Sequence, residues 1–177
     1  MHSTKVQKLL NRKAQKSYLV CCAAFRRARG QVENKLRDLG GYLPLYNAAV
    51  KGEGKDARNF FDQAPAALSA KITIALETAL HLAVGTGKAI DFVEKLVREM
   101  TPENLALTDQ QGDTALSVAA MVGNIQAAKI MVNKNPDLPN IPGKNGFPIH
   151  KAARFGRKEM VLYLMRVTKS DIESNPF

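Results

Sequence analysis

Four segments of this sequence repeat one another, and the repetition constrains the fold more than any other feature. LPLYNAAVKG (43–52), TALHLAVGTG (78–87), TALSVAAMVG (114–123) and FPIHKAARFG (147–156) align without gaps, and their starts lie 35, 36 and 33 residues apart. Each has an aliphatic residue in the third place, alanine in the sixth and glycine in the tenth. Self-similarity at a period of about 20–50 residues is typical of repeat solenoids. The sequence therefore predicts a stack of similar units.

The spacing inside each unit predicts two helices joined by a tight turn. An apolar doublet follows each glycine: Phe60-Phe61, Leu96-Val97, Met131-Val132 and Leu164-Met165. We expect the tenth-place glycines to adopt the left-handed conformation of a helix-ending turn. This conformation has a low energy only for a residue without a Cβ atom. Thr78 and Thr114 are expected to cap the first helices of their units. One helix pair cannot cover its own apolar faces, so neighbouring units must stack.

These segments resemble the ankyrin repeat, a unit of about 33 residues that opens with T-P-L-H-x-A. The resemblance covers roughly residues 42–169. It implies an all-α solenoid of about four helix-turn-helix repeats with short hairpin loops, in a domain spanning residues 42–177. The repeats are expected near 42–76, 77–112, 113–146 and 147–177.

The loops between repeats match the family unevenly. The turn Asp109–Thr114 is similar to the family's hairpin, whereas the hairpin at Ile72–Glu77 lacks the expected glycine. Residues Asn133–Gly146 are rich in proline and glycine, which favours an elongated finger over a helix. After the last helix pair no further repeat follows, so we expect incomplete cover for Met160, Val161, Leu164 and Met165.

A narrower resemblance is carried by YLPLYNAAVKGEGKDARNFF and ETALHLAVGTG. These runs are similar to the plant ankyrin family with a C-terminal membrane-embedded PGG domain, which implies a role in stress and defence signalling. No apolar run here approaches the ~18 residues of a membrane-spanning helix. The expected location is therefore the cytoplasm, or the periphery of a membrane at its cytoplasmic face.

The positive charge is concentrated at the N-terminus. Residues 1–41 hold ten Lys/Arg and two acids, and the remaining 136 residues hold sixteen and fourteen. This predicts a basic helical arm over 1–41. The alternative function of the protein is association of this arm with an anionic membrane surface; association with nucleic acid is the less favoured form of it. The adjacent Cys21 and Cys22 are either a lipidation site or two buried small apolar residues. An arginine-rich, acid-poor arm also resembles an organelle transit peptide.

No set of residues predicts catalysis. His81 and His150 occupy the fourth place of their repeats, where the family uses histidine to bridge loops by hydrogen bonds. The run Gly85–Lys88 resembles a phosphate loop, but Leu82 and Ala89 stand where that motif needs glycine and a hydroxyl. We therefore predict a non-enzyme without metal, cofactor or small-molecule substrate.

The ankyrin resemblance implies a concave groove formed by fingers and inner helices. Met121, Val122 and Phe155 are expected to be its solvent-facing apolar contacts. The predicted function is a protein–protein interaction scaffold. The expected groove positions are Val50, Lys51, Gly85, Thr86, Gln110, Gln111, Asp113, Met121, Val122, Lys144, Arg154 and Phe155.

Overall fold

The computed structural model describes residues 40–52, 65–87 and 90–168. The chain divides into two units, Met1–Gly41 and Tyr42–Phe177, and the following concerns the second. Residues 1–39 of the predicted basic arm, including Cys21 and Cys22, lie outside the described residues. The described elements are α2 (Leu43–Lys51), η1 (Pro65–Leu68), α4 (Ala79–Thr86), α5 (Ile90–Glu99), α6 (Pro102–Leu105), α7 (Ala115–Val122), α8 (Ile125–Lys134), η2 (Leu138–Asn140), α9 (Pro148–Arg154) and α10 (Lys158–Val167).

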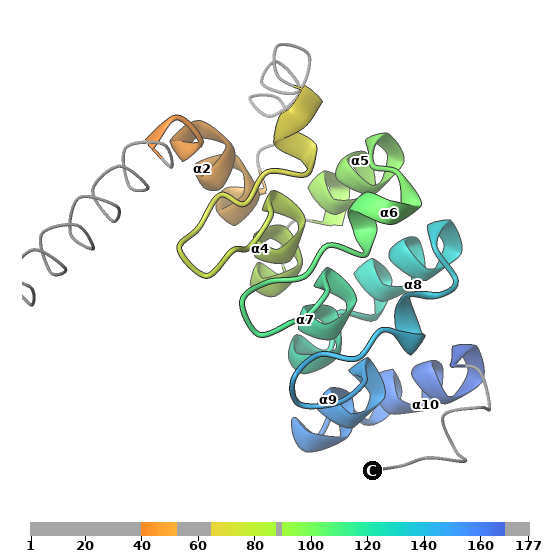
Figure 1. Cartoon of the computed structure of the whole chain (residues 1–177). Coiled ribbons are helices and arrows are strands. Elements are labelled where there is room, and N and C mark those ends of the chain that lie inside the picture. The colour runs from red at the N-terminus through yellow and green to blue at the C-terminus, as the bar shows by residue number, and fades with distance from the viewer. Residues whose placement is uncertain (1–39, 53–64, 88–89, 169–177) are drawn as a thin grey trace, which may run out of the picture. The chain divides into compact units, whose positions relative to one another are not determined.

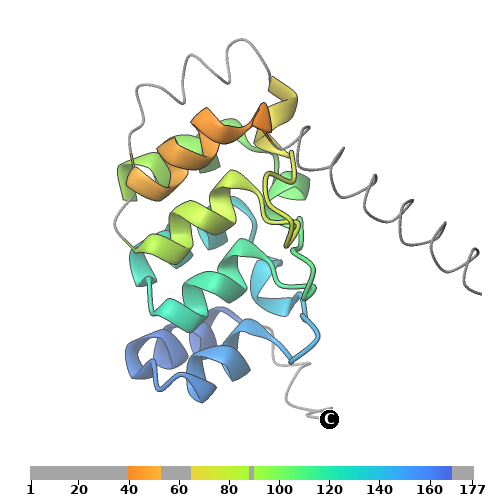
Figure 2. The same ribbon diagram turned by 90° about the vertical axis from the view of Figure 1, so that its left-hand side faces the viewer.

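The helices stack in two layers, as Figure 1 shows. The inner helices α2, α4, α7 and α9 each contact the next, and so do the outer helices α5, α8 and α10. Figure 2 shows the inner helices as a row from α2 in orange to α9 in blue. The third-place Leu45, Leu80 and Leu116 are at most 1% exposed. Burial of such apolar side chains drives the stacking, and the predicted all-α solenoid is confirmed.

The turn between the two helices of a repeat depends on its glycine. Gly52, Gly87, Gly123 and Gly156 have φ of 80°, 67°, 84° and 66°, so the predicted left-handed conformation is confirmed. The Thr114 hydroxyl accepts a hydrogen bond from the Ser117 N–H at 3.4 Å, as expected of a cap.

Replacing Gly123 with valine is expected to lower the free energy of unfolding by about 1–3 kcal/mol, because a β-branched residue is strained at positive φ. A Cβ atom there also lies 3.0 Å from the Arg157 Cδ. Urea denaturation measures the loss. Gly156→Val is the matched control for the backbone cost alone, since no described atom lies within 4 Å of its Cβ position. An unchanged unfolding midpoint for Gly123→Val would contradict the backbone assignment.

The finger before repeat two forms a hairpin without its glycine. Leu76 takes φ 60° where the next finger has Gly112 at 72°. The Leu76 N–H donates to the Thr73 carbonyl at 3.1 Å, and the Gly112 N–H donates to Asp109 in the same way. The Thr73 hydroxyl accepts from the Glu77 N–H at 3.1 Å, which fixes the base of the finger. The hydrogen bond to the Thr73 side chain thus stabilises a turn whose geometry could not be predicted from the sequence.

The expected extent of the finger over residues Asn133–Gly146 was partly wrong. Asn133 and Lys134 belong to α8, and Leu138 lies in η2 and is fully buried, so the finger after repeat three is shorter than predicted. An apolar residue in that loop folds back into the core.

In the last repeat the cover of the four residues is incomplete, as expected: Met160 and Leu164 are fully buried, whereas Val161 is half-buried. Met160 and Leu164 share the face of α10 that packs on α9 and α8. Met165, on the other side of that helix, is 61% exposed.

Candidate functional site

The eighth and ninth places of each repeat lie in the last turns of α2, α4, α7 and α9, or directly after them. Together with the fingertips they are called the candidate binding face below. Val50, Lys51, Gly85, Val122, Arg154 and Phe155 are exposed there, whereas Thr86 and Met121 are half-buried. Because the four helices stand in a row, these residues follow one another along one edge (Figure 2).

The fingertips are joined by hydrogen bonds. The Gln110 N–H donates to the Ala75 carbonyl at 2.8 Å, and the Lys144 N–H donates to the Gln111 carbonyl at 3.0 Å. The Lys144 Nζ also donates to the Gln110 carbonyl at 2.9 Å. The side chains of Gln110, Gln111 and Lys144 remain exposed. Three successive fingers thus present their tips on a hydrogen-bonded edge.

Asp113 departs from the expectation, because it lies at the base of its finger and is 3% exposed. Its Oδ2 pairs with the Lys151 Nζ at 2.5 Å, and that lysine is 5% exposed. The Asp113 carboxylate therefore joins repeats three and four and offers nothing to a partner. Sequence reasoning missed Lys151. Its signal was a lysine in the fifth place, where repeats two and three have Leu82 and Val118.

His81 connects repeats two and three, which confirms its bridging role. The Thr78 N–H donates to His81 Nδ1 at 3.3 Å, and Nε2 lies 3.0 Å from the Asp113 carbonyl. Since a carbonyl oxygen only accepts, Nε2 carries the proton of a neutral ring. In repeat four, His150 Nδ1 accepts from the Phe147 N–H at 3.3 Å, but the residue is exposed.

Acid is expected to weaken the fold through His81. Burial lowers the pKa of this imidazole, and the Asp113 carbonyl only partly opposes the shift. Above the ordinary pKa of about 6.5, both folded and unfolded chains hold it neutral, and the group contributes nothing to pH dependence. Below that pH the unfolded chain binds a proton that the folded chain disfavours. The free energy of unfolding should therefore fall by about 1 kcal/mol between pH 7.5 and 5.5.

Urea denaturation at both pH values measures this loss. His81→Gln keeps a polar side chain but removes the titration, so its stability should depend less on pH. Equal pH dependence in the two proteins would contradict the assignment to His81.

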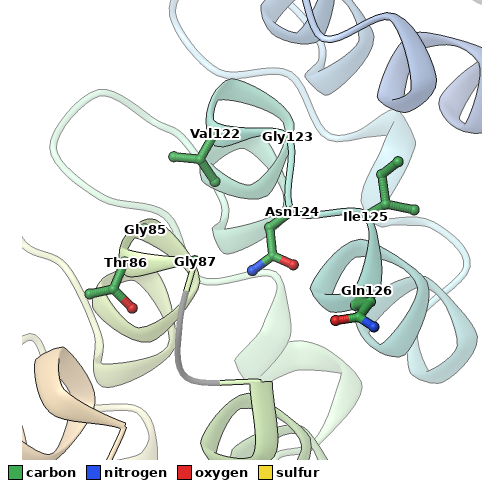
Figure 3. A pocket seen from close by; sticks show the side chains of 8 residues that line it. All are labelled: Gly85, Thr86, Gly87, Val122, Gly123, Asn124, Ile125 and Gln126. Atoms are coloured by element: carbon green, nitrogen blue, oxygen red, sulfur yellow. The ribbon is translucent and has the colours of Figure 1, made fainter.

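A hollow of about 420 Å³ opens on the candidate binding face between repeats two and three. Figure 3 shows Thr86 and Val122 on one part of its wall, and Asn124 and Gln126 on another. Gly85 contributes no side chain. The Asn124 Oδ1 accepts from the Ala127 N–H at 3.1 Å, which turns that side chain toward the start of its own helix. The described residues that line the hollow carry no charge: Gly85, Thr86, Gly87, Val122, Gly123, Asn124, Ile125 and Gln126.

A family model described as ankyrin repeats (3 copies) matches residues 80–175, which is more than half of the chain. The chain belongs to the ankyrin-repeat family. Ankyrin repeats generally mediate protein–protein interaction, and the family is typically a non-catalytic scaffold. The search of curated proteins finds no match.

The described part of this ankyrin-repeat protein holds neither a candidate metal site nor a candidate membrane-spanning helix. Among residues 40–52, 65–87 and 90–168, no group of three His, Cys, Asp or Glu residues could hold a metal ion. None of the helices in those ranges is long and apolar enough to cross a bilayer.

The candidate binding face offers amides, backbone carbonyls, basic side chains and apolar contacts. Such groups can recognise another chain by hydrogen bonds and apolar burial.

Proposed function

We propose that the protein is a non-catalytic scaffold that binds other proteins through the candidate binding face. The observation that supports this most is the exposure of apolar side chains at the eighth or ninth place of three repeats. Val50 is 39% exposed, Val122 is 36% exposed and Phe155 is 52% exposed. The basic side chains of Lys51 and Arg154 stand beside two of them. Apolar contacts with a polar rim are typical of protein-binding sites.

The same proposal includes the domain bounds, cellular role and location expected from the sequence. Residues 42–177 form the binding domain, and the basic residues 1–41 form a separate arm. A place in plant stress and defence signalling, in the cytoplasm or at the cytoplasmic face of a membrane, follows from the resemblance to the PGG family and stays a prediction. The second candidate function is association of the arm with an anionic membrane surface. It is favoured by the net charge of the arm, ten basic residues against two acidic ones.

Amide hydrogen exchange of the full chain, alone and with a bound partner protein, tests the proposal. Binding should slow exchange at the turn residues Gly87 and Gly123 and at the fingertip residues Gln110 and Gln111. Buried amides of α5 and α8 should exchange as before, because those helices lie in the outer layer. Protection confined to residues 1–41 would place partner binding on the basic arm and contradict the proposal.

A further inference from the structure

The side chain of Arg157 in repeat four reaches back to the end of the inner helix of repeat three. Its Nε donates to the Met121 carbonyl at 2.9 Å. Its Cδ passes 3.0 Å from the Cβ position of Gly123, so the side chain lies across the glycine that ends α7. The carbonyls at a helix C-terminus carry partial negative charge, which favours a cation there. One repeat thus covers the end of the preceding inner helix with a guanidinium group.

The equivalent place between repeats two and three holds Asn124, the residue directly after its turn glycine. This side chain is shorter, and its hydrogen bond to the Ala127 N–H keeps it at the start of α8. No described atom lies within 4 Å of the Cβ position of Gly87. The hollow of about 420 Å³ stands at this position (Figure 3). It is therefore the same site as the one that Arg157 fills, without the arginine.

We infer that this hollow binds a guanidinium group, supplied by an arginine side chain of a protein partner. The Gly85 carbonyl holds the place of the Met121 carbonyl in the repeat alignment and is the expected acceptor. None of the described residues that line the hollow is a cation. Residues 42–147 carry ten Lys/Arg against eleven Asp/Glu, so this part of the domain does not repel an arginine by net charge.

This inference rests on the proposed function, because it assigns the chemistry of one contact on the candidate binding face. A tripeptide, acetyl-Gly-Arg-Gly-amide, tests it by titration into the isotopically labelled full chain. We expect saturable amide shifts at Gly85, Gly87 and Asn124. The matched peptide with citrulline, which has nearly the same shape and no charge, should bind at least tenfold more weakly. Equal binding of both peptides, or no saturable shift at these amides, overturns the inference.

Asn124→Arg closes the hollow by supplying the guanidinium from within the chain, and it also removes the cap of α8. This variant should weaken binding of the arginine peptide at least tenfold. Unchanged binding to folded Asn124→Arg overturns the inference.

Arg157→Asn makes the opposite test. It removes the guanidinium that covers Gly123, so a second saturable set of shifts should appear at Met121 and Gly123. Failure to create this second site in a folded protein also counts against the inference. Phe155→Ser, one repeat away, should leave the peptide titration unchanged. Absence of arginine-peptide binding would therefore contradict the arginine site alone. A protein partner whose affinity does not change in Phe155→Ser would count against the scaffold proposal alone.

Discussion

Replacing Lys151 with methionine is expected to lower the free energy of unfolding by about 3–5 kcal/mol, because it leaves a buried carboxylate without its counter-ion. Asp113 Oδ2 pairs with the Lys151 Nζ at 2.5 Å, and both side chains are at most 5% exposed. Asp113 Oδ1 has no hydrogen-bond partner among the described residues. The carboxylate therefore depends on one cation. Methionine keeps much of the apolar stem of lysine, so the loss reports the charge rather than a cavity.

The double variant Asp113→Asn with Lys151→Met is the matched control for this loss. Removing both charges of a buried pair costs far less than removing one. Urea denaturation of the wild type, both single variants and the double variant should show that the double variant recovers most of the stability lost by Lys151→Met. A loss below about 1 kcal/mol in Lys151→Met would show that water reaches the pair.

Replacing Val122 and Phe155 together with serine should weaken the binding of a protein partner about 30-fold, or about 2 kcal/mol, since central apolar contacts dominate interfaces. The two side chains are 36% and 52% exposed, so the free energy of unfolding should change by less than about 1 kcal/mol. Met121 is less suitable for this test than the sequence implied, because it is half-buried. Titration calorimetry measures the affinity, and thermal unfolding measures the stability.

An acidic partner adds a kinetic expectation. Arg154→Glu should slow its association at low salt, because exposed charges steer the encounter. Affinity unaffected by the double serine variant, in a protein that remains folded, would place the binding site elsewhere.

The sequence was sufficient for features set by neighbouring residues. The turn glycines and the cap at Thr114 follow from local backbone geometry, and the repeat period predicts stacking. The hairpin at Leu76 was not predictable in this way, because its strained residue is held by the Thr73 hydroxyl and by the Gln110 N–H of the next finger, which donates to the Ala75 carbonyl.

The Asp113–Lys151 ion pair and the hollow could not be predicted from the sequence, because both depend on contacts between stacked repeats. Asp113 and Lys151 lie 38 residues apart and meet only when repeats three and four stack. The hollow depends on whether the residue after each turn glycine bonds within its own helix, as Asn124 does, or reaches back, as Arg157 does. Both side chains are polar and occupy the same place in the repeat, so the pattern alone does not distinguish them.

Partners are expected to bind the repeats and not the basic arm. Partner affinity for the full chain, measured in two variants side by side, distinguishes these two sites. The first replaces Val122 and Phe155 with serine, and the second replaces Lys5, Lys8, Arg12 and Lys13 with glutamine. We expect binding to fall about 30-fold in the first variant and to be unchanged in the second. Full binding in the serine variant together with loss in the glutamine variant, accompanied by loss at high salt, would contradict the scaffold and favour an electrostatic contact of the arm.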